Sequence, residues 1–260
     1  MAVPLIDAHC HLDCEAFRDR VSEILAGAAE AGVTRLVSCA TQPDEWASTA
    51  ALAKAHPSVA FALGIHPWYV TPESATAALR LADARLMGAS AIGEVGLDTH
   101  ADAPMDLQQA TFEVQLAMAG KADLPVVVHC RGAFGELMRI LRSVGPPARG
   151  GVVHAYSGNE EIAADLMEMG FYLSMGRSLT YRNSKKRVQV LKRIYPDRLL
   201  LETDSPDMPP VELSGTVNVP ANLPYCLRAA AELLERPEEE VAKATTANAR
   251  RLFGLGKAGR

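Results

Sequence analysis

The sequence predicts a (β/α)8 TIM barrel, a fold of the α/β class, closed by a C-terminal helix. Short apolar runs alternate with longer alanine-rich segments along the 260 residues, and such alternation is typical of a parallel sheet. We count eight strand–helix units, which gives roughly 32 residues for each, the size of one such repeat. A length of about 250 residues is also usual for this barrel.

Eight runs rich in valine, isoleucine and leucine are short enough to be buried strands. They are Leu5–His11, Arg35–Ala40, Val59–His66, Ala91–Leu97, Val126–Arg131, Gly151–Tyr156, Phe171–Met175 and Leu199–Asp204. Segments between them have the periodicity of amphipathic helices: Val21–Ala31, Glu45–Lys54, Glu73–Leu86, Leu107–Ala122, Phe134–Val144, Glu160–Met169 and Lys185–Ile194. Glycine or proline often ends a helix before the next strand, as Gly32 and Pro125 do. The tail, Glu238–Phe253, is expected to supply the closing helix.

An open doubly wound sheet is the alternative fold for this pattern. That fold normally carries a glycine-rich phosphate turn after its first strand, whereas the segment His9–Asp13 contains no glycine. No linker or low-complexity stretch divides the chain, so residues 1–260 are predicted to form a single barrel domain. The long loop Ser205–Pro224 is expected to be a lid or a wall of the site, because such loops in compact domains are usually functional.

Composition narrows the class of function. The chain has 26 basic and 31 acidic residues and a net charge of −5, whereas general nucleic-acid binders are usually basic. Any polyanion must therefore be held locally. Five scattered cysteines, an odd number, indicate reduced thiols and fit a cytoplasmic protein. We find no signal-peptide pattern, no apolar run long enough for a membrane helix and no segment that indicates an obligate protein partner.

Six side chains of metal-binding type lie at the ends of predicted strands: His9, His11, Glu94, His129, His154 and Asp204. The carboxyl ends of barrel strands meet at one rim, where catalytic groups project. His9 and His11, two residues apart on a strand, should face the same side. A carboxylate such as Glu94 inside an apolar strand is costly unless it is paired or bound to metal. The pattern therefore predicts two divalent metal ions that share Glu94.

We expect His9, His11 and Asp204 around one ion, with His129 and His154 around the other. These donors suit zinc, and also manganese, iron or cobalt, while magnesium stays an alternative. Two divalent ions outweigh two carboxylates, so the centre would attract phosphate even on an acidic protein. A metal-activated water would supply the nucleophile. Asp204 is the best candidate to take its proton, which makes Asp204 and Glu94 the expected catalytic residues.

Three further residues are candidates for contacting the substrate. Arg131 lies two residues after His129 and could bind a phosphate through paired hydrogen bonds. His66 ends the third predicted strand and could donate to a substrate oxygen. Tyr156 shares its strand parity with His154. These three positions are expected to face the bound substrate.

Two acidic residues are expected behind the ligands, namely Asp7, which has the parity of His9, and Glu202. For Arg131, an ion pair with Glu202 or Asp98 is the alternative to a phosphate contact. Trp68 and Tyr69 could stack a base. Runs of basic residues are usually solvated helix faces, but the densest one is also the candidate position for the backbone of a polyanion. It comprises Arg177, Arg182, Lys185, Lys186 and Arg187.

Several of these motifs together resemble the TatD family of metal-dependent hydrolases, among the amidohydrolase-like barrels. The runs DAHCHLD, GIHPW, AIGEVGLD, PVVVHCR, VVHAYSG and LLLETDSPDMP follow one another over residues 7–209, and residues 217–220 resemble the family's Asn-x-Pro turn. The resemblance implies a (β/α)8 barrel, two divalent ions and DNase activity, commonly from a 3′ end. It carries over the same six ligand positions. Departures at Cys130, Gly132 and Thr99 touch no ligand and bear on the substrate surface.

The leading hypothesis is thus phosphodiester hydrolysis, with DNA ends as the substrate. The acidic net charge favours short or single-stranded ends. The alternative is a metal-dependent hydrolase of a carboxylic ester or amide, for example an aminoacyl nucleic-acid ester, because the same centre can polarise a carbonyl. A metal-dependent binding scaffold without activity is a third reading, which the complete ligand set disfavours.

Overall fold

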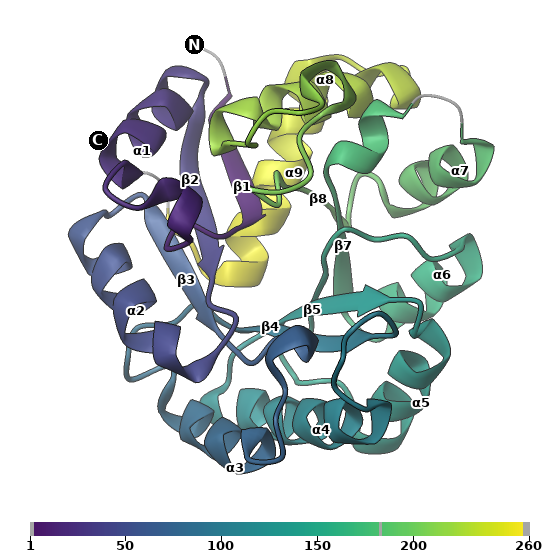
Figure 1. The fold of residues 1–260 in the computed structure, drawn as a ribbon. Coiled ribbons are helices and arrows are strands. Elements are labelled where there is room, and N and C mark those ends of the chain that lie inside the picture. The colour runs from purple at the N-terminus through teal and green to yellow at the C-terminus, as the bar shows by residue number, and fades with distance from the viewer. Residues whose placement is uncertain (1–2, 182–183, 257–260) are drawn as a thin grey trace.

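The computed structural model describes residues 3–181 and 184–256, and its strands form the predicted barrel. One parallel sheet contains all eight strands in sequence order. They are β1 (Leu5–Cys10), β2 (Val33–Cys39), β3 (Val59–Leu63), β4 (Ala91–Asp98), β5 (Val126–Arg131), β6 (Gly151–Val153), β7 (Phe171–Met175) and β8 (Leu199–Leu201). Figure 1 shows the helices arranged around this ring of strands. The predicted fold class is confirmed.

Within the described residues, nine α-helices surround the ring; the first seven connect successive strands and the last two follow β8. They are α1 (Val21–Glu30), α2 (Trp46–Ala55), α3 (Ser74–Ala78), α4 (Met105–Ala122), α5 (Phe134–Val144), α6 (Glu160–Glu168), α7 (Lys185–Ile194), α8 (Leu223–Leu234) and α9 (Glu238–Phe253). The predicted helix Glu73–Leu86 is instead the short α3 followed by a 3-10 helix, Leu79–Asp83. Helix α8 was not among the predicted helices, and its first two residues were assigned to the loop Ser205–Pro224. Proline is tolerated in the first turn of a helix, and Pro224 occupies such a position.

The barrel interior and the layer between strands and helices are separate apolar clusters. The interior cluster includes Ile6, Ala8 and Leu200, together with Leu252 and Phe253 from α9. Helix α9 therefore covers one end of the barrel, and Figure 1 shows it in yellow beside β1 and β8. The predicted closing helix is confirmed. Polar side chains lie at the opposite end, where the strands end.

Register shifts in β1 and β4 interrupt the alternation of inward and outward side chains. In β1, Asp7 pairs with Leu36 but Cys10 pairs with Ser38, so β1 holds one extra residue over this stretch. Ala8 belongs to the interior cluster and Cys10 to the outer one, which leaves His9 turned inward beside Ala8. Such irregularities re-aim side chains and are common beside active sites.

Strand β4 has the same kind of shift. Ile92 pairs with Val126 and Val95 with Val128, so the extra residue falls at Gly93–Glu94. Both Ile92 and Val95 belong to the outer cluster. Since simple alternation would place these two residues on opposite faces, the shift allows Glu94 to point inward between them.

Residues after β8 complete the ring against β1. The Asp204 N–H donates to the His9 carbonyl over 3.0 Å, and the His11 N–H donates to the Ser205 carbonyl over 2.8 Å. Strand β8 ends at Leu201 and not at the predicted Asp204, because the Thr203 N–H donates to the Asp7 carboxylate instead of a neighbouring strand. Within residues 3–181 and 184–256, no helix is both long enough and apolar enough to cross a bilayer.

Candidate metal centre

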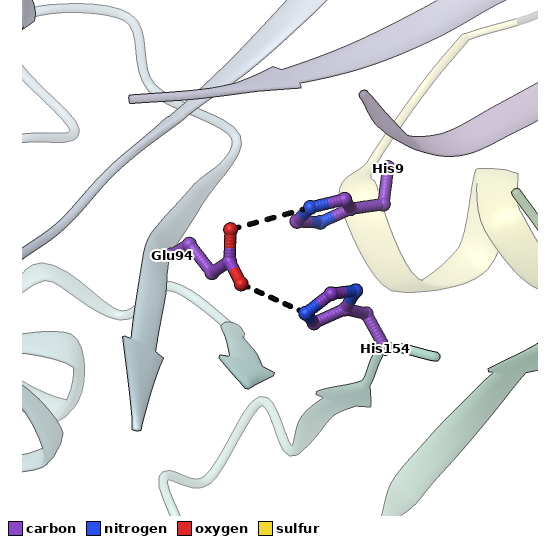
Figure 2. Close-up of side chains that lie close together, drawn as sticks. All are labelled: His9, Glu94 and His154. Atoms are coloured by element: carbon purple, nitrogen blue, oxygen red, sulfur yellow. Dashed lines mark ion pairs between the residues drawn. The ribbon is translucent and has the colours of Figure 1, made fainter. Parts of the chain in front are cut away.

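Glu94 lies at the centre of a cluster of histidines at the carboxyl ends of the strands. Its Oε2 atom is 3.3 Å from Nε2 of His9 and 3.4 Å from Nε2 of His11. Its Oε1 atom is 2.7 Å from Nε2 of His154. Figure 2 shows the carboxylate between the His9 and His154 rings, with one oxygen toward each. A carboxylate divided in this way has the geometry to bridge two cations.

Two more histidines face the Oε1 side of Glu94. His66 Nε2 lies 3.3 Å and His129 Nδ1 lies 3.1 Å from that oxygen. The ligand atoms of three sets fall within 4.8 Å of one another: His9, Glu94 and His154; His9, His11 and Asp204; His66, Glu94 and His129. Imidazole nitrogens and carboxylate oxygens are the donors that zinc and related divalent ions prefer, so these residues fit such ions.

Asp204 reaches the His9 side of the cluster from the loop after β8. Its Oδ1 lies 3.4 Å from His9 Nε2 and 3.8 Å from His11 Nε2. The residue has a φ of 57°, a left-handed conformation that is uncommon outside glycine. That turn directs the carboxylate toward the histidines while the Asp204 N–H bonds to the His9 carbonyl. The side chains of His11 and Asp204 are 17% and 18% exposed, so this side of the cluster is open to solvent.

Hydrogen bonds fix the orientation of two imidazoles. His11 Nδ1 donates to the Cys39 carbonyl over 2.8 Å, which leaves Nε2 with a free lone pair. His129 Nε2 donates to Asp98 Oδ2 over 3.0 Å, which leaves Nδ1 toward Glu94. Outer contacts of this kind set the tautomer of a metal-binding histidine. The Cys39 Sγ atom also lies 3.4 Å from His9 Nδ1, so one residue of β2 contacts both His9 and His11.

His66 is held as a donor. Its Nδ1 accepts a hydrogen bond from the Trp68 N–H over 3.1 Å, so the proton of the neutral ring resides on Nε2. Nε2 faces Glu94 Oε1 and donates to it. Burial lowers the pKa of His66, which favours this neutral form. His66 therefore presents a hydrogen-bond donor to the cluster, and neither of its ring nitrogens offers a free lone pair to a metal ion.

Charge is distributed unevenly over the cluster. Burial opposes ionisation of Glu94, but the facing imidazoles, His154 foremost, outweigh it and hold the pKa of Glu94 well below its ordinary range. Burial and the neighbouring His154 lower the pKa of His9 to about 4. Burial also acts to lower the pKa of His154, but facing carboxylates, led by Glu94, raise it to about 10. Without a cation, positive charge collects on His154 and negative charge on Glu94.

Comparison with known proteins agrees with this geometry. The family model described as TatD related DNase matches residues 6–254. The chain belongs to the TatD family. YabD of Bacillus subtilis, named as an uncharacterized metal-dependent hydrolase, is 36% identical over 96% of this chain and 99% of its own length. The crystal structure of YjjV, a TatD homologue from Escherichia coli, matches with a TM-score of 0.91 and 33% identity over 98% of this chain and 100% of YjjV. This chain is accordingly a metal-dependent hydrolase of the TatD family.

Two acidic residues predicted behind the ligands of this TatD-family site have different surroundings. Glu202 lies behind His154, with its Oε2 atom 3.9 Å from His154 Nδ1, and it accepts hydrogen bonds from the Ala155 N–H and the Ser174 hydroxyl. Asp7, in contrast, accepts from the main chain of His9 and from both the N–H and the hydroxyl of Thr203. The expected contact between Asp7 and an imidazole ring is wrong, because the register shift in β1 separates the faces of Asp7 and His9.

Tyr156 does not face the metal centre in the way that strand parity predicted. Strand β6 ends at Val153, and Ala155 has a φ of 43°, so alternation does not extend past His154. The Tyr156 hydroxyl donates to the Asn159 carbonyl over 2.7 Å, and its buried ring packs against Phe134. The hydroxyl proton of Tyr156 is therefore engaged by the protein itself.

Arg131 ends β5 as an exposed side chain. Across residues 3–181 and 184–256 its guanidinium forms no hydrogen bond or ion pair, so the alternative pairing with Glu202 or Asp98 does not occur. Both carboxylates are buried and engaged by histidines instead. Arg182, part of the predicted basic stretch, lies outside the described residues.

The sequence reasoning missed two contributors to the TatD-family centre. The first is Asp98, which the sequence reasoning considered only as a partner for Arg131. Asp98 orients His129 and also accepts a hydrogen bond from Trp68 Nε1 over 2.7 Å. A carboxylate that ends the apolar run AIGEVGLD was the available signal, of the same kind that identified Glu94. The contacts of Cys39 had no such signal, because one of them involves its main-chain carbonyl.

Proposed function

We propose that this metal-dependent hydrolase cleaves phosphodiester bonds and acts as a deoxyribonuclease, trimming DNA from the 3′ end with a two-metal centre. The observation that carries the proposal is the division of the Glu94 carboxylate between His9 and His11 on one oxygen and His129 and His154 on the other. Two cations held by these residues would supply the charge that in-line displacement at phosphorus requires. The description of the matching family model as TatD related DNase supports the same substrate class.

Six residues would hold the ions, with zinc expected from the donor types. His9, His11 and Asp204 would bind the first, His129 and His154 the second, and Glu94 both. When bound, the ions would supply Lewis acidity and lower the pKa of a water molecule toward neutrality. Manganese, cobalt, iron or magnesium stay alternatives, to be separated by the experiment below.

The protein's own groups have distinct tasks in this proposal. Asp204, partly exposed at the open side of the cluster, takes the proton of the attacking water. Without a cation His66 donates its Nε2–H to Glu94 Oε1; with a cation bound, the same N–H would be released to donate to a phosphoryl oxygen as charge builds there. Arg131 is exposed and unpaired within the described chain, so its planar guanidinium is free to bind a phosphate through two hydrogen bonds.

Trp68 is placed to contact a base next to the cleaved bond. The residue is 55% exposed, while its Nε1 donates to Asp98, the residue that also orients His129. A large exposed aromatic ring that is anchored at one edge is a suitable stacking surface for an unpaired base. This arrangement supports single-stranded ends as the preferred substrate. All five cysteines are free, which supports the proposed cytoplasmic location.

The test compares substrates on metal-free protein. End-labelled single-stranded DNA, duplex DNA and small carboxylic esters are incubated with zinc, magnesium, manganese or cobalt added singly. We expect progressive shortening of single-stranded DNA from its 3′ end in the presence of metal. Ester hydrolysis without DNA turnover would overturn the proposal in favour of a carboxylic ester or amide hydrolase.

Glu94→Ala is the matched loss-of-function variant, and Glu136→Gln on the exposed face of α5 is its control. Glu94→Ala should abolish turnover and lower the metal content measured by mass spectrometry. Full activity in Glu94→Ala would remove this residue from the centre.

A further inference from the structure

A tyrosine between two arginines lies in the segment after β7. The Cζ atoms of Arg177 and Arg187 lie 5.3 and 5.9 Å from the centroid of the Tyr181 ring. Arg187 also donates to the Tyr181 carbonyl over 2.6 Å. Tyr181 is 41% exposed. Both Cζ atoms lie within the roughly 6 Å of a cation–π contact, so the two guanidinium groups are held beside a ring that stays partly open to solvent.

The same pairing elsewhere in the barrel has a different environment. Arg198 lies 5.0 Å from the ring centroid of Tyr172, but Tyr172 is only 4% exposed and belongs to the interior cluster. That pair is part of the packing of the fold. The exposure of Tyr181 distinguishes it, because an aromatic ring left open between two cations serves no comparable packing role.

This segment borders the metal centre. Gly176, directly before Arg177, packs so closely on Glu202 that an added Cβ would lie 2.7 Å from the Glu202 carbonyl oxygen. Further along, the Thr180 hydroxyl accepts from the Val211 N–H over 3.0 Å, in the loop that follows Asp204. Because the segment leaves the carboxyl end of β7 and contacts the loop after β8, it lies on the rim that carries the metal ligands.

The cations of this segment are not neutralised within the described chain. Neither Arg177 nor Arg187 forms an ion pair with a carboxylate in residues 3–181 or 184–256, and Arg177 Nε has no hydrogen-bond partner there. Lys185 and Lys186, both exposed at the start of α7, add two positive charges. A concentration of positive charge beside an exposed aromatic ring, on a chain of net charge −5, is complementary to a polyanion with bases.

We propose that Tyr181, Arg177 and Arg187 form a second contact site for single-stranded DNA, beyond the nucleotide that is cleaved. A base stacks on the Tyr181 ring, and the guanidinium groups bind the phosphates on either side of it. This site rests on the proposed nuclease function, since it extends the same substrate across the rim. It makes substrate length, and not only the scissile bond, a determinant of affinity.

The experiment measures binding and turnover with the metal-loaded protein. A labelled phosphorothioate oligothymidylate of about twelve nucleotides, within the usual span of single-strand sites, resists cleavage and reports affinity by fluorescence anisotropy. The matching unmodified strand and a thymidine dinucleotide report kcat/KM. The variants are Tyr181→Ala, Tyr181→Phe and Arg187→Ala. Arg193→Ala is the charge control, because Arg193 lies at the opposite end of the same helix.

We expect Tyr181→Ala to weaken binding of the long strand about tenfold, as for other bases stacked on aromatic rings, and to leave dinucleotide turnover unchanged. Tyr181→Phe should bind like the wild type because it keeps the ring. Arg187→Ala should make the salt dependence of binding shallower by about 0.7 in log–log slope for one lost phosphate contact. Arg193→Ala should leave binding and its salt dependence unchanged.

Equal affinity of Tyr181→Ala and the wild type for the long strand would overturn the site, even if DNA is cleaved normally. A wild-type protein that binds the long strand through Tyr181 but cleaves no DNA would instead overturn the nuclease proposal and leave the binding site standing. The two failures are therefore distinguishable.

Discussion

Asp98 Oδ2 accepts a hydrogen bond from Nε2 of His129 over 3.0 Å. The bond fixes which nitrogen of His129 faces Glu94, since Nδ1 then lies 3.1 Å from Glu94 Oε1. Burial acts to raise the pKa of Asp98, but its hydrogen bonds, first that from His129, hold the pKa well below the ordinary range. Asp98 is therefore a charged hydrogen-bond acceptor, and protein groups supply its hydrogen bonds.

From this contact we predict that Asp98→Asn weakens metal binding by about 10- to 100-fold, the usual effect of losing an outer-shell partner of a histidine ligand. Chelator competition followed by metal analysis measures the affinity. Asp102→Asn, at an exposed position in the loop after β4, is the control and should bind metal normally. Wild-type affinity in Asp98→Asn would show that the His129 ring is oriented by packing alone.

Gly96 is required by the close approach of β4 to β5. Its φ is 137°, and an added Cβ would overlap the carbonyl oxygen of His129. We predict that Gly96→Ala lowers the free energy of unfolding by roughly 3 kcal/mol or more, because strain and overlap add. Urea denaturation measures the change. Gly120→Ala, on the exposed side of α4 with no atom within 4 Å of an added Cβ, should instead be neutral or stabilising by up to about 1 kcal/mol. A similar loss in both variants would contradict the proposed clash.

His66 should affect turnover more than metal content, because its Nδ1 is occupied by the Trp68 N–H and its Nε2 is a donor. We predict that His66→Ala lowers kcat about 100-fold, as for loss of one preorganised donor, while bound metal stays at the wild-type level. His66→Gln, which can still donate, should recover part of the rate, and His56→Ala at the end of α2 should have no effect. Loss of metal in His66→Ala would reassign the residue as a ligand.

Metal binding should release protons at neutral pH. In the metal-free protein the pKa of His154 is raised to about 10 from an ordinary value of 6.5, mainly by Glu94 against the effect of burial. A ligand imidazole must be neutral, so binding displaces this proton and metal affinity falls as pH falls. Calorimetry in two buffers of different ionisation enthalpy measures the release. Identical apparent enthalpies in both buffers would contradict a protonated His154.

The raised pKa of His154 affects the stability of the metal-free protein in the opposite direction to metal affinity: stability falls as pH rises. Because the folded-state pKa of His154 is above its unfolded value, its stabilising contribution is complete below about pH 6.5 and is lost as pH rises through about 10. Added metal should restore stability, by about 2.7 kcal/mol at a free concentration 100 times the dissociation constant. Thermal melts with and without chelator across this pH range test the prediction. A metal-free protein whose stability rises steadily from pH 7 to 10 would contradict it.

Local sequence was sufficient for much of the fold and the site. The alternation of apolar runs with amphipathic segments fixed the class, and helices Phe134–Val144, Lys185–Ile194 and Glu238–Phe253 have the predicted bounds. Ionisable side chains inside or directly after apolar strands, such as Glu94 and His129, were visible because burying them without partners is costly. These signals depend on neighbours along the chain, and they can be recognised without knowing which residues of other strands lie next to them in the fold.

Other features of the site depended on contacts between residues that are distant in the sequence. The register shifts in β1 and β4 turn His9 and Glu94 inward, and they arise from pairing with neighbouring strands. The hydrogen bonds of Asp7 to Thr203 bring together residues almost 200 positions apart. Strand parity misplaced Asp7 for this reason, since a single extra residue reverses every side chain beyond it. Periodicity is a property of one strand, whereas register and ring closure are properties of two, and so only the assembled barrel decides which atoms meet at its rim.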